Sequence, residues 1–183
     1  MADNFKERFS QAVKETETVV YSYLAEETGH QKTIFEAMNY SVKAGGKRLR
    51  PLLMREVYRL FGGNGPEIEP FMAAMEMIHT SSLIHDDLPC MDNDEYRRGK
   101  LTTWKAYGYD MAVLAGDALM IYAFETASKA FSMGADPAKV GRAIGILAEK
   151  TGIYGMIGGQ TVDVELTLSL IHISEPTRLD VIS

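Results

Sequence analysis

Apolar residues recur at helical spacing along almost the whole chain, between breaks made by glycine and proline, and this pattern limits the fold more than any other feature. Phe5, Phe9 and Val13 begin a first amphipathic helix, which we expect to fade at Gly29. Alternating patterns that would indicate strands and internal repeats are both missing from the sequence. The pattern therefore predicts an all-α fold.

Glycine and proline also set the ends of the other expected helices. Gly45-Gly46 and the stretch GGNGP are stop signals, and Pro89 ends a helix because it lacks an N–H and clashes with the preceding turn. Asp136-Pro137 is an N-cap followed by proline. The helices expected after the first span about 32–43, 48–61, 66–88, 109–133 and 138–152. Since no linker interrupts them, residues 1–167 are interpreted as one domain.

Composition narrows the classes of function. The 183 residues are 46% hydrophobic, which is typical of a globular protein, and the net charge of −6 gives no basic footprint for nucleic acid. Asp117 and Glu125 interrupt the most apolar run, 111–124, so we expect no membrane span. A hydrophobic signal region is missing from the N-terminus, and Cys90 is a lone cysteine. These features predict a cytoplasmic protein.

A cluster of acids follows an apolar helix in the sequence LIHDDLPCMDNDE. Asp86 and Asp87 lie at the expected C-terminal end of that helix, where the helix dipole makes carboxylates unfavourable. Pro89 breaks the helix, so the chain can loop and bring Asp92 back towards Asp86. Carboxylate oxygens suit Mg²⁺, which shares its ligands with substrate phosphates. The cluster predicts a magnesium site, and a solvated acidic helix end is the alternative.

Basic residues form a second cluster, in the stretch GGKRLRP. Lys47 and Arg50 are three residues apart, and we expect them to clamp one anion from a shared helix face. Arg97 and Arg98 add two guanidinium groups, whose planar forks suit phosphate oxygens. A solvated basic turn is the alternative. The basic sites and the metal site together indicate an enzyme that holds two phosphorylated substrates.

Histidine accompanies the aspartates on the same helix. His79 stands seven residues before Asp86, so both side chains project from one face. A lone histidine in such a position is more often a core residue than a ligand. His85 is assigned no role.

The chain resembles the trans-prenyl diphosphate synthases, the farnesyl and geranylgeranyl diphosphate synthase family of the bacterial short-chain type. The resemblance runs from the N-terminus to about Thr167 and rests on five motifs in order: GGKRLRP, IHTSSLIHDDLPCMDND, RRGK, AGDALM and GGQTVDVE. It implies an isoprenoid-synthase helical bundle around a central cavity and a homodimer at full length.

The resemblance also implies a role for each motif residue. Asp86 and Asp92 would bind Mg²⁺, with Asp87 supporting them, and Arg97 would contact the allylic diphosphate. Gln160 and Asp163 would line the allylic site. The residues that would hold isopentenyl diphosphate are Lys47, Arg50, His79 and Arg98.

The implied reaction condenses isopentenyl diphosphate with dimethylallyl, geranyl or farnesyl diphosphate and releases pyrophosphate. Magnesium would neutralise the departing group. In the family, a bulky side chain about one turn before the first aspartate closes the cavity; in this chain Ser81 and Ser82 occupy that position. We therefore expect a geranylgeranyl product or a farnesyl and geranylgeranyl mixture.

Three other functions remain open. A terpene cyclase shares an aspartate-rich helix and metal, although GGKRLRP and RRGK favour two substrates. A non-catalytic subunit of a heteromeric synthase is a second alternative, which the intact aspartates disfavour. A purely structural bundle leaves the two basic clusters unexplained.

The last residues depart from the family pattern. The family continues well past Thr167 with a second aspartate-rich motif and a lysine, whereas residues 168–183 read LSLIHISEPTRLDVIS. Residues 168–178 resemble the translation of a transposase adapter used in sequencing libraries. We therefore expect 168–183 to be a non-family tail, and the chain as written to be truncated and inactive.

Overall fold

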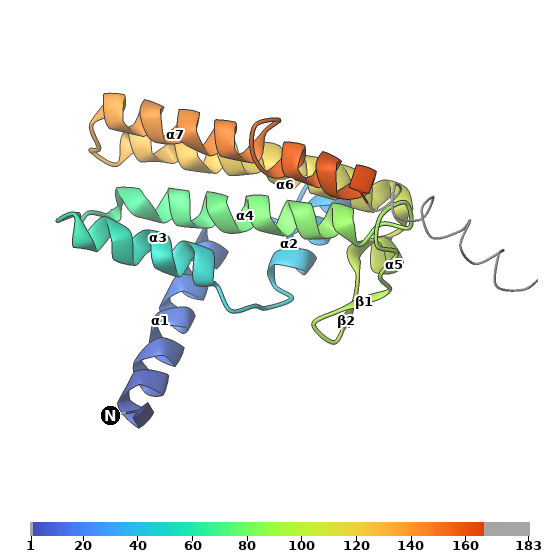
Figure 1. Cartoon of the computed structure of the whole chain (residues 1–183), viewed down its shortest axis with the longest axis horizontal. Helices are drawn as coiled ribbons and strands as arrows, with labels where there is room; N and C mark the ends of the chain where they lie inside the picture. Colours follow the sequence, from blue (N-terminus) through green and yellow to red (C-terminus); the bar gives the residue numbers. More distant parts are fainter. Residues whose placement is uncertain (1, 167–183) are drawn as a thin grey trace, which may run out of the picture. The chain divides into compact units, whose positions relative to one another are not determined.

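Two long helices, α4 (Glu69–Asp86) and α6 (Tyr109–Ser128), lie side by side and carry most of the residues discussed below (Figure 1). The computed structural model describes residues 2–166, with side chains from Asn4 onward, and the expected tail 168–183 lies outside them. The chain divides into two compact units, residues 1–140 and the part that begins at Gly141. The described residues are mostly helical, which confirms the all-α prediction.

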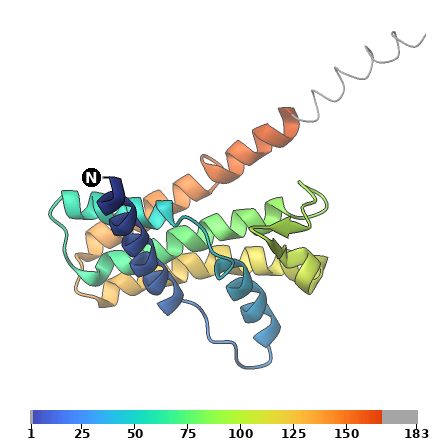
Figure 2. The same ribbon diagram turned by 90° about the horizontal axis from the view of Figure 1, so that it is seen from below.

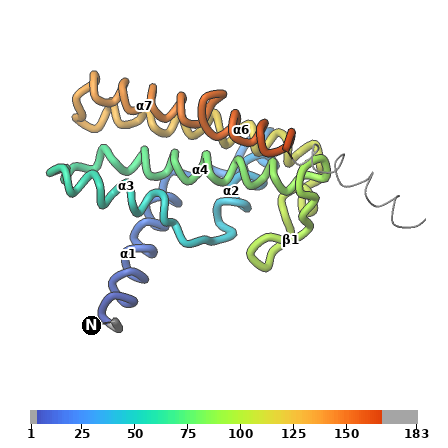
Figure 3. Tube along the Cα trace, in the orientation of Figure 1, coloured from blue at the N-terminus to red at the C-terminus, as the bar shows by residue number. Residues whose placement is uncertain are grey.

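The first unit holds most of the helices. Figure 2 shows α1 crossing the pair of long helices, and the tube in Figure 3 shows α3 running beside α4. Besides α4 and α6, its elements are α1 (Ala2–Ser22), α2 (Lys32–Val42), α3 (Leu49–Leu60), the 3₁₀ turns η1 (Pro66–Ile68) and η2 (Lys129–Ser132), the strands β1 (Tyr96–Arg97) and β2 (Lys100–Leu101), and α5 (Thr103–Tyr107).

The second unit contains most of α7 (Pro137–Thr151), which begins at the end of the first unit, and a helical segment at 156–166. The expected N-cap is confirmed, because the Asp136 carboxylate accepts a hydrogen bond from the Ala138 amide at 2.9 Å.

Small side chains bring α4 and α6 close together. Ala112, Ala115 and Ala123 repeat at helical spacing on α6 and are fully buried. From α4, Met72 and Met77 are fully buried and fill the remaining space. Close packing against α6 therefore fixes the helix that carries His79 and the aspartates.

Several helix ends differ from the sequence prediction, among them that of α6, which stops at Ser128 rather than near 133. The first helix stops at Ser22 rather than near Gly29, because the Asn39 amide holds the following loop by donating to Ala25 O at 2.8 Å. Helix α4 ends at Asp86, two residues before the expected end at Leu88. The Leu88 N–H donates to His85 O, three residues back, in a tighter turn. Pro66 opens η1, and α4 itself begins at Glu69.

The sequence predicted no strand, and this prediction is wrong because the described residues include one short hairpin. Strands β1 and β2 pair antiparallel, with Arg97 opposite Lys100. Arg98 and Gly99 form the turn with φ values of 54° and 77°, the two positive values that a type I′ turn requires. Each strand has only two residues, too few to show an alternating pattern.

One helical segment of the described residues, Tyr109–Ser132, is long and apolar enough to cross a membrane by length and composition alone, and the expectation of no membrane span stays a prediction. The core helix of a soluble protein passes the same test, and α6 packs along α4.

Candidate active site

A cleft of about 450 Å³ brings together the four residues that the family resemblance assigned to one diphosphate. Lys47 and Arg50 enter from the start of α3, His79 from α4 and Arg98 from the hairpin turn. Lys47 precedes the helix, which begins at Leu49, so the two basic residues do not share a helix face as expected. They line the same cleft because the chain turns between them.

Positive charge dominates this cleft. The Arg50 guanidinium lies 3.3 Å from His79 Nε2. Burial, followed by the charge of Arg50, lowers the pKa of His79 and favours its neutral form. Burial, followed by the nearby Arg48, also lowers the pKa of Arg98. Cations that depress one another's protonation make a site that a polyanion would stabilise.

The backbone at residue 46 favours glycine, and it lies against the Arg98 guanidinium. Its φ of +149° is disfavoured for side-chain-bearing residues, and a Cβ there would lie 2.8 Å from Arg98 Nη1. Arg98 also donates a hydrogen bond to Gly45 O. The glycine pair therefore allows the Arg98 guanidinium to lie against the loop.

The aspartate-rich loop folds back as the sequence predicted. After Pro89 the Asp92 amide donates to Asp86 O at 2.9 Å, and the Asn93 amide donates to Leu88 O at 3.0 Å. Burial, followed by the charge of Asp92, raises the pKa of Asp86. The two carboxylates thus lie near enough to repel each other, and a cation near them would relieve this repulsion.

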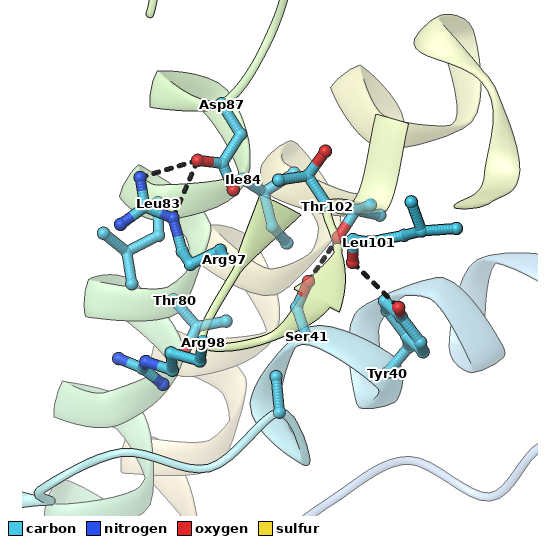
Figure 4. A pocket seen from close by; sticks show the side chains of 12 residues that line it. Tyr40, Ser41, Thr80, Leu83, Ile84, Asp87, Arg97, Arg98, Leu101 and Thr102 are labelled. Carbon is cyan, nitrogen blue, oxygen red and sulfur yellow. Dashed lines mark hydrogen bonds and ion pairs between the residues drawn. The ribbon is translucent and has the colours of Figure 1, made fainter. Parts of the chain in front are cut away.

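The Asp87 side chain forms a hydrogen bond and an ion pair with Arg97. It is almost fully buried, and Arg97 donates to its Oδ1 from Nε at 2.7 Å, with Nη2 at 2.6 Å (Figure 4). Burial raises the pKa of Asp87, although the Arg97 hydrogen bond opposes that rise. The Asp87 carboxylate is therefore held against Arg97, and its expected role of supporting the metal-binding aspartates stays a prediction.

Figure 4 shows the two neighbouring arginines separating: Arg97 lies beside Asp87, whereas Arg98 lies nearer Thr80, further back along α4. Both line a second pocket of about 30 Å³, and Arg98 also lines the large cleft. Arg98 thus connects the aspartate end of α4 with the anion cleft.

Polar contacts from α5 hold the loop that follows the aspartates. Thr102 Oγ1 and Trp104 Nε1 each donate to Asp94 O at 2.8 Å. Lys105 pairs with Glu95 at 2.6 Å. Sequence reasoning missed these residues, because a threonine or tryptophan outside a motif gives no local sign of a distant carbonyl partner.

The donor set at the aspartates suits a hard cation. Within residues 2–166 no group of three or more histidine, cysteine, aspartate or glutamate residues is arranged to hold a metal. Mg²⁺ differs from metals held in all-protein cages, since it is commonly bound through one or two carboxylates plus substrate phosphates. Asp86 and Asp92 supply such a pair, so the residues present fit the expected ion.

The remaining predicted residues lie elsewhere. Ser81 is fully buried and donates to Ile78 O at 2.8 Å, and Ser82 donates to His79 O at 2.9 Å. Neither serine lines the two pockets described above. Gln160 and Asp163 belong to the second unit. The roles of these four residues stay predictions.

Sequence reasoning also missed Arg48 and Glu76, which line the large cleft together. Arg48 Nη1 lies 2.7 Å from Glu76 Oε1, and both residues are almost fully buried. Burial on its own lowers the pKa of Arg48, but the hydrogen bonds and charges of Glu76 and Tyr21 together outweigh it and raise the pKa. Arg48 lies between Lys47 and Arg50 in the sequence, and nothing in its local sequence indicated that its side chain is buried.

Comparison with known proteins gives a consistent set of relatives. The family model described as "Polyprenyl synthetase" matches residues 31–178. A "Heterodimeric geranylgeranyl pyrophosphate synthase large subunit 1, chloroplastic" from Arabidopsis thaliana is 54% identical over 132 residues, 72% of this chain and 36% of the relative. A "Dimethylallyltranstransferase" from Fischerella ambigua is 45% identical over 154 residues, 79% of this chain and 44% of the relative. The chain therefore spans less than half the length of either curated relative.

Solved structures resemble the chain as well. A farnesyl/geranylfarnesyl diphosphate ("FPP/GFPP") synthase from Zymomonas mobilis matches with a TM-score of 0.82 and 41% identity, over 90% of this chain and 59% of that one. A geranyltransferase from Legionella pneumophila matches with a TM-score of 0.80 and 34% identity, over 86% of this chain and 55% of that one.

Proposed function

The chain belongs to the polyprenyl synthetase family, and we propose that the full-length protein condenses isopentenyl diphosphate with an allylic diphosphate and releases pyrophosphate. The allylic substrate is dimethylallyl, geranyl or farnesyl diphosphate, and the product is farnesyl or geranylgeranyl diphosphate. Relatives named as geranylgeranyl pyrophosphate synthases support this assignment.

One observation carries the proposal: helix α4 carries His79 at the anion cleft and Asp86, the first of the carboxylate pair, two turns further along. His79 lines the cleft, and Asp86 ends the same helix seven residues later, about 10 Å further along at ~1.5 Å per residue. This spacing suits two diphosphates that must be held close together but separately. Arg97 and Arg98 line a small pocket together with Asp87, and Arg98 also lines the cleft.

In the proposed mechanism, Lys47, Arg50, His79 and Arg98 hold the isopentenyl diphosphate, and Arg97 contacts the allylic diphosphate. Asp86 and Asp92 hold Mg²⁺, which when bound supplies Lewis-acid stabilisation of the leaving pyrophosphate. Asp87 keeps Arg97 oriented, which reduces the reorganisation needed when charge develops on the leaving group.

The bond changes balance with these two substrates alone. The allylic C–O bond breaks, and its electron pair leaves with the pyrophosphate. The isopentenyl double bond then attacks the allylic cation, and a proton is lost to the released pyrophosphate. Apolar side chains beside the aspartates, such as Leu83 and Ile84, limit the access of water to the cation.

A second candidate is a subunit of a heteromeric synthase, because one relative is named the large subunit of a heterodimeric enzyme. Such a subunit would release pyrophosphate only together with its partner chain. A homodimer at full length is the arrangement we propose.

Pyrophosphate release by the full-length protein tests the proposal. We expect release with magnesium, isopentenyl diphosphate and an allylic diphosphate, and none when isopentenyl diphosphate is omitted. Release from the allylic diphosphate alone would indicate a terpene cyclase instead. No release under any of these conditions would contradict the proposed enzyme.

A further inference from the structure

Arg48 lies between Lys47 and Arg50 in the sequence, but its side chain, unlike theirs, is buried. Lys47 and Arg50 are exposed at the cleft, whereas the Arg48 side chain has 0% exposure. Its backbone is in the left-handed region, with φ 50° and ψ 30°, at the residue that caps α3. A residue other than glycine adopts this conformation when its surroundings hold it there.

Four acceptors on three other segments hold the Arg48 guanidinium. It donates to Glu76 at 2.7 Å on α4, and to Glu17 at 3.2 Å and Tyr21 OH at 3.1 Å on α1. It also donates to Val42 O at 2.7 Å, at the end of α2. The guanidinium carbon lies 5.7 Å from the centre of the Tyr21 ring. One side chain therefore joins α1, α2 and α4 behind the loop.

We propose that Arg48 is a positioning residue for the anion cleft, and this rests on the proposed function of the cleft as the isopentenyl diphosphate site. Glu76 lies one turn before His79 on the same face of α4 and lines the cleft with it. Anchoring Arg48 to Glu76 sets the distance between the loop that carries Lys47 and the helix that carries His79.

Charge explains why Arg48 is not itself an anion ligand. Two carboxylates, Glu76 and Glu17, pair with its guanidinium. The positive charge left to the cleft comes from Lys47, Arg50 and Arg98. Lysine could not replace Arg48, because an ammonium group lacks the planar fork that reaches several acceptors at once.

Arg55 provides a matched control. It is also a nearly buried arginine that joins helices, with Glu15 on α1 at 3.4 Å and Glu56 at 3.2 Å. It does not line the cleft. Arg55→Lys therefore disturbs a comparable helix-joining ion pair and leaves the cleft intact.

The experiment uses the full-length protein and measures two quantities. Calorimetry without metal gives the affinity for inorganic pyrophosphate and for isopentenyl diphosphate, and steady-state kinetics give KM for each substrate and kcat. We expect Arg48→Lys to weaken both affinities and to raise KM for isopentenyl diphosphate. The upper limit is about a hundredfold, the loss of rate that a misplacement of about 1 Å can cause. KM for the allylic substrate should stay unchanged.

Glu76→Gln keeps the shape of the side chain and should weaken isopentenyl diphosphate binding in the same selective way, so it replaces Arg48→Lys if that variant does not fold. Equal effects on both substrates, or effects of Arg48→Lys no larger than those of Arg55→Lys, would overturn the proposal. A wild-type protein that binds pyrophosphate but releases none from substrates would refute the proposed function alone, because the binding comparison still tests Arg48.

Discussion

Arg97 holds a single oxygen of Asp87 with two of its nitrogens, Nε at 2.7 Å and Nη2 at 2.6 Å. A charge-assisted hydrogen bond and an ion pair to the same carboxylate oxygen restrain both side chains. Among the described residues Asp86 has no such hydrogen bond or ion pair of its own. The two adjacent aspartates therefore differ in their contacts: Asp87 is paired with Arg97, whereas the side chain of Asp86 is not.

The first prediction concerns turnover. In the full-length protein, Asp86→Asn or Asp92→Asn should lower kcat by orders of magnitude, because the amide is a weaker ligand for a hard cation. Steady-state pyrophosphate release over a magnesium titration measures this. Asp110→Asn is the control, since Asp110 is an exposed carboxylate in the first turn of α6 and asparagine can also accept the bond that the Met111 amide donates to it at 2.9 Å. Near wild-type turnover of either variant at saturating magnesium would remove these residues from the metal site.

A second prediction concerns pH and stability without metal. Burial and Asp92 raise the folded-state pKa of Asp86, so its contribution is fully present below the unfolded pKa of about 3.9 and is lost as pH rises through the folded pKa. Asp86→Asn should therefore unfold at a higher temperature than wild type at pH 7, and the difference should vanish near pH 3. Thermal unfolding in a chelator measures it; a variant less stable at pH 7 would contradict the assignment.

The glycine pair gives a third prediction. Gly46→Ala should raise KM for isopentenyl diphosphate, because its Cβ would lie 2.8 Å from Arg98 Nη1 and displace the guanidinium. Gly45→Ala is matched, since Gly45 also has a positive φ, of 87°, but a Cβ there would meet nothing within 4 Å. Both variants lose stability through backbone strain. Equal KM values for the two would show that Arg98 does not depend on the close approach.

Packing between α4 and α6 gives a fourth prediction. A Cβ on Gly116 would lie 2.8 Å from His85 Cε1 and closer still to Nε2, which is 3.2 Å from Val113 O. Gly116→Ala should therefore destabilise the protein by about 1–3 kcal/mol through overpacking. Denaturant unfolding measures the loss. Adding His85→Ala removes the ring and should recover part of it, whereas simple addition of the two losses would argue against this contact.

The fifth prediction concerns product length. Ser81→Tyr should shift products of the full-length protein toward farnesyl diphosphate, because a ring one turn before the aspartates would shorten the space for the growing chain. Chromatography of the dephosphorylated products measures the shift. Ser82→Tyr, on the neighbouring half-buried position, is the comparison. An unchanged profile in Ser81→Tyr would show that other residues close the cavity.

Local chemistry in the sequence determined most of the helix ends, whereas the resemblance to a known family indicated the cleft residues. Pro89 ends α4 within three residues, and Asp136 caps α7, because capping and proline effects act over one turn. The motif residues Lys47, Arg50, His79 and Arg98 were named from the sequence and line one cleft.

Only the tertiary structure decided which partner each of the arginines contacts. In the sequence Arg48 looks the same as its basic neighbours, but its partner Glu76 is 28 residues away. Arg97 contacts Asp87 from a hairpin strand of only two residues, which is too short to be recognised from the sequence. Burial of a charge is tolerated only when distant segments supply its acceptors. The direction of each arginine therefore follows from packing between helices, which spacing along the chain does not encode.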